Sequence, residues 1–176
     1  MRASVVLLLA TILVVSRAAR AEVVCGYTVN SNPGPGEGFF KYTPCEDSDK
    51  KFRSSKDAAK NYLTKERSKL KKAIKDRFGI LPNNSDFARA QKAIDDARKL
   101  NNQEWERFLR DNPGCRGSDA CTRNNQEIAI HNEGDPTLIS HEGIHIVIDS
   151  AADRGRREAD NESLDAFIYE WLSRHH

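Results

Sequence analysis

The chain has 176 residues, enough for one domain with a small appendage. Charged residues make up 31% and hydrophobic residues 38%, which excludes a disordered tract and a polytopic membrane protein. The 28 lysine and arginine residues nearly balance the 26 aspartate and glutamate residues. The chain thus has no overall basic excess, and we expect no nucleic-acid partner.

The first 21 residues have the layout of a secretory signal peptide. Met1-Arg2 is a positive start, a largely apolar stretch runs from Val5 to Val15, and Ala19-Arg20-Ala21 resembles a cleavage site. The apolar stretch is shorter than the roughly 20 residues that a membrane span needs. Residues 1–21 hold three arginines and no acidic residue, so their removal leaves 25 basic and 26 acidic residues. We expect a secreted or periplasmic protein without a membrane anchor after cleavage.

The four cysteines suit two disulfides in such a compartment. Residues 22–50 are rich in glycine, proline, asparagine and serine, and predict an irregular N-terminal loop with a short strand near 22–28. A Cys25–Cys45 bridge would close this loop. Cys115 and Cys121 flank a short polar segment whose spacing is not that of a zinc knuckle, so a Cys115–Cys121 disulfide is favoured over metal ligation.

Residues 51–110 are predicted to form three helices, because apolar residues recur there at spacings of three and four. The first helix is expected to begin near Ser54, which forms a Ser-x-x-Asp start signal, and to end at Gly79. The second is expected at Asp86–Leu100, capped by Ser85, and the third at Gln103–Arg110.

The segment that follows the second cysteine pair is predicted to combine one strand with two helices. Residues 126–131 alternate polar and apolar side chains, as a strand does. Asp135-Pro136 is a helix start signal, and that helix should continue to about Ser150 with apolar residues on several faces. A last helix is expected from Glu158 to Ser173. The sequence thus predicts a helix-dominated α+β domain over 51–176. The strand should lie against the first of the two helices, with an unpaired edge open to an extended peptide.

The first of these two helices contains His141-Glu142-Gly143-Ile144-His145. Histidines at positions i and i+4 share one helix face, so both rings can reach one ion, and zinc suits such nitrogen ligands. Glu142 can approach a water at that ion without binding the ion itself, and can take its proton. The motif predicts two zinc ligands and a general base. Two core histidines with Glu142 at the surface would be the structural alternative.

A catalytic zinc needs a third protein ligand. The metzincin pattern requires a histidine at the position of Ala151, so that class is excluded. Downstream carboxylates remain, and Asp149 better suits a supporting role because it lies one turn beyond His145. Glu158, Glu162 and Asp165 share one face of the last predicted helix, and Glu162 is central on that face. These candidates, together with Asp153, are spread over residues 149–165.

The stretch from the histidine motif to Asn161-Glu162-Ser163-Leu164-Asp165 resembles the gluzincin metallopeptidases of the thermolysin-like clan, in a minimal form. The resemblance implies zinc ligands at His141, His145 and Glu162, with Glu142 as base. It also implies that Asp165 orients a ligand histidine, although Asp165 follows Glu162 by three residues where the family has four. The expected fold is an active-site helix packed on the C-terminal helix.

The sequence therefore predicts a secreted zinc-dependent metallopeptidase with Zn²⁺ as cofactor and a peptide or protein as substrate. Tyr169 is the candidate for stabilising the transition state, since it lies seven residues after Glu162. The alternative is a secreted, disulfide-stapled helical binding protein with a non-catalytic motif. Its basic face would be residues 50–77, which hold twelve basic and three acidic side chains. Such a run is more often one solvated helix face.

Overall fold

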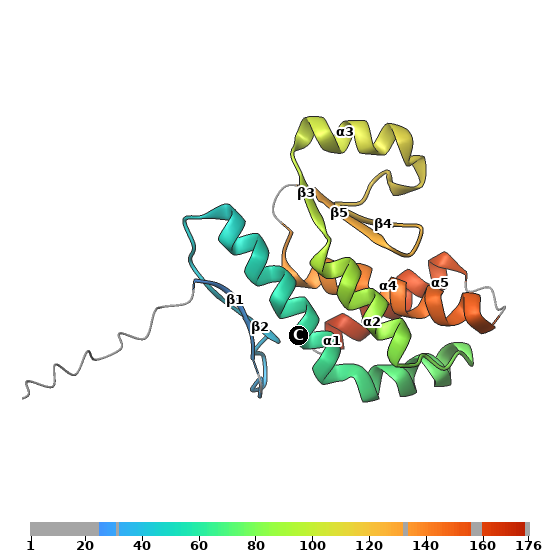
Figure 1. Cartoon of the computed structure of the whole chain (residues 1–176). Helices are drawn as coiled ribbons and strands as arrows, with labels where there is room; N and C mark the ends of the chain where they lie inside the picture. The colour runs from blue at the N-terminus through green and yellow to red at the C-terminus, as the bar shows by residue number, and fades with distance from the viewer. Residues whose placement is uncertain (1–24, 31, 132–133, 156–159, 175–176) are drawn as a thin grey trace, which may run out of the picture.

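The computed structural model describes residues 25–30, 32–131, 134–155 and 160–174 (Figure 1). The predicted signal peptide and Glu158 lie outside these residues. The elements are β1 (Gly26–Val29), β2 (Phe40–Thr43), α1 (Ser48–Phe78), α2 (Asn84–Asp95), β3 (Arg98–Leu100), α3 (Asn102–Asp111), a 3₁₀ turn at Pro113–Cys115, β4 (Ala120–Arg123), β5 (Glu127–His131), α4 (Pro136–Gly155) and α5 (Asn161–Arg174). Helices dominate, beside two small sheets, so the predicted α+β class is confirmed.

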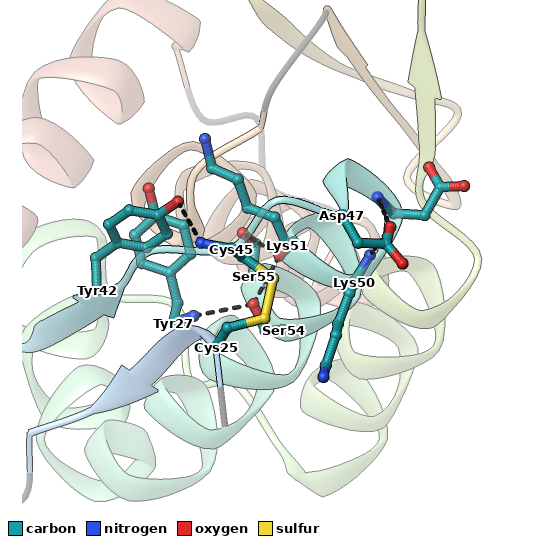
Figure 2. Close-up of a disulfide and its surroundings, with 10 residues drawn as sticks. Cys25, Tyr27, Tyr42, Cys45, Asp47, Lys50, Lys51, Ser54 and Ser55 are labelled. Carbon is teal, nitrogen blue, oxygen red and sulfur yellow. Dashed lines mark hydrogen bonds between the residues drawn. A yellow bond between two sulfur atoms is a disulfide. The ribbon is translucent and has the colours of Figure 1, made fainter. Parts of the chain in front are cut away.

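The N-terminal segment is more regular than the predicted loop. Strands β1 and β2 pair antiparallel, and the Cys25–Cys45 disulfide ties the segment before β1 to the one after β2, as predicted. The hairpin packs on α1, where the Ser54 hydroxyl accepts a hydrogen bond from the Tyr27 backbone N–H at 2.9 Å (Figure 2). The sequence prediction missed the hairpin because its turn is longer than the two-residue turns that have a recognisable sequence signature.

Helix α1 begins earlier than predicted. Asp47 is its N-cap, with a side-chain oxygen that accepts from the backbone N–H groups of Asp49 and Lys50. Ser54 is therefore an interior residue, and the expected start there is wrong. The predicted end is confirmed at Gly79, which has a left-handed φ of 65° that glycine adopts at little cost.

Helix α2 is shorter than predicted, and it is capped by Asn83 in place of Ser85. The side chains of Asn83 and Asp86 form reciprocal hydrogen bonds with each other's backbone N–H groups, which is a capping box. The helix ends at Asp95, so the prediction of a helix up to Leu100 is wrong. Arg98–Leu100 form β3, which pairs with β5 and so takes its structure from a distant part of the chain.

The second sheet has the order β3-β5-β4, with β3 parallel and β4 antiparallel to β5 (Figure 1). Ala129 on one face packs with the Trp105 and Phe108 side chains of α3, whereas Ile128 and Ile130 on the other face join the main core. Strand β5 is thus paired on both sides, and the prediction that residues 126–131 offer an unpaired edge is wrong. The edge strand that contacts α4 is β4.

Helix α4 runs through the main core, and α1, α2 and α5 pack around it. Its apolar side chains are buried on several faces, as predicted. Gly143 allows the close approach of α1 and α2, because a Cβ there would meet Leu63 and Ile94 side-chain atoms at 3.0 and 2.9 Å. The helix ends at Gly155, beyond the predicted Ser150. Among the described residues, no helix is both long and apolar enough to cross a membrane.

Candidate metal centre

Two histidines of α4 point to one place. His141 and His145 are one helical turn apart, and their Nε2 atoms lie 3.1 Å from each other. His141 is 7% exposed, because α4 is surrounded by the core at this turn. The structure thus brings the two predicted ligand histidines together, with Nε2 as the converging atom of each.

Asp165 on α5 completes the cluster. Its Oδ1 lies 3.2 Å from His141 Nε2 and 2.9 Å from His145 Nε2. Leu164, Ile168 and Leu172 form the buried stripe of α5 and fix its rotation against the core. Asp165 lies about 60° from Ile168 around the helix axis, at the border of this stripe.

The prediction that Glu162 provides the third carboxylate does not match this geometry. Glu162 lies about 120° from Ile168 around the same axis, and it is exposed. Among the described residues, which do not include Glu158, the ligand atoms that converge belong to His141, His145 and Asp165. Asp165, expected to support a ligand histidine from behind, thus lies at the position of a ligand itself. The family motif favoured Glu162 over Asp165 because it carries no information on how the buried stripe rotates α5.

The cluster fits a small divalent cation. Ligands at about 2.0–2.1 Å around a tetrahedral ion are about 3.3 Å apart, and the three separations here are 2.9–3.2 Å. The lone pairs of His141 Nε2, His145 Nε2 and Asp165 Oδ1 converge on one point. Without a cation, at least two of these atoms would face each other with no proton between them. Two imidazoles and one carboxylate form a donor set that zinc accepts, with one coordination position left open.

The protonation of His141 favours metal binding. Burial, followed by the neighbouring charge of His145, lowers the pKa of His141 to about 4. The ring is consequently neutral near pH 7, and its Nε2 lone pair is available to an ion. Asp165 opposes this shift only in part, since its side chain is about half exposed, at 52%. The centre therefore has a buried side on α4 and an accessible side on α5.

Glu142 is held beside the histidines by a neighbouring strand. The residue is 6% exposed, and its Oε2 accepts a hydrogen bond of 2.6 Å from the Thr122 hydroxyl of β4. Burial raises the pKa of Glu142, and the Thr122 hydrogen bond opposes that rise. The charges of His145 and Asp165 also influence the pKa of this carboxylate. Glu142 is buried, which differs from the structural alternative that put it at the surface.

Tyr169 and a cavity adjoin His141. The Tyr169 ring centroid is 4.6 Å from that of His141, and the residue is 63% exposed, so it does not belong to the core. The cavity has a volume of about 150 Å³. Its lining combines the two rings with the side chains of Thr137, Leu138, Leu172 and Ser173. Because His141 belongs to both, the cavity adjoins the cluster directly.

The remaining candidate residues have other surroundings. Asp149 is half-buried, and burial raises its pKa, whereas Asp153 is exposed and accepts a hydrogen bond from Asn125. Neither belongs to the cluster. The Cys115–Cys121 disulfide is confirmed. Thr122 was missed by the sequence analysis, because nothing in a sequence places a threonine of an unpredicted strand opposite Glu142.

Comparisons with known protein families, with curated proteins and with solved structures gave no match. Function is therefore inferred from the site itself.

Proposed function

We propose that this protein is an exported zinc-dependent metallopeptidase that hydrolyses peptide bonds. The observation that carries the proposal is the convergence of His141, His145 and Asp165 within 3.2 Å, with the buried Glu142, which Thr122 holds, on the same helix turn as the two histidines. This arrangement supports a zinc peptidase site in which an aspartate, Asp165, takes the place of the third ligand, so it departs from the gluzincin resemblance, which requires a glutamate there.

Each side chain has a distinct part in the proposed reaction. Zinc, when bound, lowers the pKa of a water and polarises the scissile carbonyl. Glu142 takes a proton from the attacking water and passes it to the leaving amine, so that the peptide C–N bond breaks. The raised pKa of Glu142 suits this transfer, because a base whose protonated form is also accessible can return the proton. Tyr169 is the side chain proposed to stabilise the negative charge on the carbonyl oxygen.

Two features near the cluster support a peptide as substrate. Within the described residues, strand β4 pairs with β5 on one side only, so its other edge offers backbone N–H and C=O groups to an extended chain. The cavity beside His141 is bordered by Leu138 and Leu172 and can take an apolar side chain of that peptide. A peptide bound along β4 would run past Glu142, which Thr122 of the same strand contacts.

The two disulfides support export, because such bonds persist mainly in oxidising compartments. The signal-peptide layout of residues 1–21 indicates the same route.

A peptide-library cleavage assay with Glu142→Gln tests the proposal. The wild-type chain loaded with zinc should cleave peptides, and the Glu142→Gln variant should bind zinc equally well but lose at least about a hundredfold in kcat, the contribution of a general base. Glu106→Gln makes the same change at an exposed position of α3, away from the cluster, and should leave the activity unchanged. Retained activity in Glu142→Gln would reject the mechanism.

The alternative is a binding protein that uses its basic segment and has no catalytic metal. Several lysines of α1 are paired within the fold, such as Lys60 with Asp95 and Lys72 with Asp76, which reduces the charge available to an anionic partner. Elemental analysis separates the two functions. About one zinc per chain supports the peptidase, and no zinc supports the binding protein.

A further inference from the structure

Strand β4 presents two different surfaces, and one of them is turned to α4. Ala120 and Thr122 share a face with their β5 partners Ile130 and Ile128, both of which are fully buried in the main core. Cys121 points to the opposite face, where it packs near Trp105 and Phe108. Thr122 is consequently a hydroxyl-bearing residue at a position whose neighbours on that face are apolar.

A valine would fit this position by shape and by strand preference. The hydroxyl adds one contact, the 2.6 Å hydrogen bond that Thr122 Oγ1 donates to Glu142 Oε2. The Thr122 backbone also contributes a hydrogen bond to this carboxylate, so Thr122 restrains Glu142 through both its side chain and its main chain. The hydroxyl is the part of this restraint that a side-chain substitution removes. The backbone of the strand is fixed along its whole length by its pairing with β5, from Ala120 opposite Ile130 to Arg123 opposite Glu127.

We propose that Thr122 is a positioning residue that orients the Glu142 carboxylate toward the ligand bound at the histidine–aspartate cluster. The inference rests on the proposed peptidase function, which it deepens by adding a residue from the edge strand. Thr122 acts through Glu142 and need not touch the substrate through its side chain. The same strand that is open to the peptide would thus also align the base that acts on it, so that peptide binding and proton transfer share one element.

A purely structural role is the competing explanation, in which the hydroxyl only satisfies a buried carboxylate. Such a role predicts lower stability for Thr122→Val without a specific effect on the chemistry. A positioning role predicts a fall in kcat with little change in KM, and a fall in the affinity for a ligand that contacts Glu142. Benzohydroxamate is a suitable probe, because it binds zinc through two oxygens and can donate a hydrogen bond to a neighbouring carboxylate.

The experiment measures benzohydroxamate affinity by calorimetry on the zinc-loaded protein, together with kcat and KM on a cleaved peptide. Thr122→Val should weaken hydroxamate binding about tenfold, the effect of one lost hydrogen bond, and lower kcat at least about tenfold at constant zinc content. Thr122→Ser keeps the hydroxyl and should restore both values. Thr28→Val, the same change at an exposed position of β1, is the matched control and should leave both values unchanged.

A double-mutant comparison separates orientation of Glu142 from general destabilisation. In a Glu142→Ala background, Thr122→Val should no longer change hydroxamate affinity. Two results would show that the inference is wrong while the peptidase proposal stands, provided that wild-type protein binds zinc and hydroxamate. Either Thr122→Val keeps wild-type affinity and kcat, or it loses affinity equally in the Glu142→Ala background. If wild-type protein binds neither zinc nor hydroxamate, the peptidase proposal fails and the inference fails with it.

Discussion

Burial differs sharply among the three residues that converge at the candidate metal centre. His141 is almost fully enclosed, whereas about half of the Asp165 side chain is exposed. The enclosed ring costs free energy when it is protonated, so its pKa falls. The core thereby prepares a neutral nitrogen ligand, while the exposed carboxylate can adjust to an arriving ion.

The lowered pKa of His141 predicts how stability depends on pH in the metal-free chain. The folded-state pKa is about 4 and the ordinary value is 6.5, so between these values the unfolded chain binds more protons than the folded chain. The neutral His141 ring therefore gives the folded chain its full contribution to the free energy of unfolding above pH 6.5. This contribution is lost as the pH falls toward 4. Urea unfolding of wild type and His141→Asn from about pH 7 to about pH 4 measures the difference.

The His141→Asn variant should show a weaker loss of stability at low pH than wild type. Glu142 and Asp149 act in the opposite direction, because burial raises their pKa values and the folded chain then binds more protons as the pH falls. Both residues are present in both proteins, so the comparison isolates His141. Parallel pH profiles for the two proteins would show that the ring is not protected from protonation.

At the scale of elements, the sequence correctly predicted those helix ends that depend only on neighbouring residues. The helix start at Asp135-Pro136 and the Gly79 cap depend on residues within one or two turns, and the structure agrees with both of them. Strands β3 and β4 have three and four residues, and each depends on pairing with β5 from elsewhere in the chain. The choice of Asp165 over Glu162 likewise depends on how α5 rotates against the core. Such tertiary effects leave no periodic pattern for a sequence to show.

The Cys115–Cys121 disulfide is predicted to support the site through β4. It ties the first turn after α3 to the residue preceding Thr122, whereas Cys25–Cys45 ties the hairpin that packs on α1. Replacing either pair by serines should lower the free energy of unfolding by about 2–3 kcal/mol, as expected for closing loops of these sizes. Only the loss of Cys115–Cys121 should also lower kcat, because it frees the strand that holds Glu142.

Denaturant unfolding and peptide cleavage, measured on Cys115→Ser/Cys121→Ser and on Cys25→Ser/Cys45→Ser, test this difference. The second variant is the control for general destabilisation, and its kcat should equal that of wild type at a temperature where both variants are folded. Equal loss of kcat in the two variants would mean that β4 has no special role.

At the scale of the whole molecule, the proposed centre joins two elements that are distant in the chain. His141 and His145 belong to the central helix, and Asp165 belongs to the C-terminal helix, which packs on α4 (Figure 1). An ion bound to all three would link α4 to α5 and stabilise the native state by mass action. The position of α5 would then matter as much for binding as the histidine motif itself.

Zinc stoichiometry in matched variants tests the proposed metal centre most directly. Purified wild type, Asp165→Asn and Glu162→Gln would each be dialysed against zinc and then analysed for bound metal. We predict about one zinc per chain for wild type and for Glu162→Gln, and a loss of zinc affinity of at least about tenfold for Asp165→Asn, because a carboxylate ligand is removed. Absence of zinc from wild type, or loss of zinc in Glu162→Gln with retention in Asp165→Asn, would contradict a centre built from His141, His145 and Asp165.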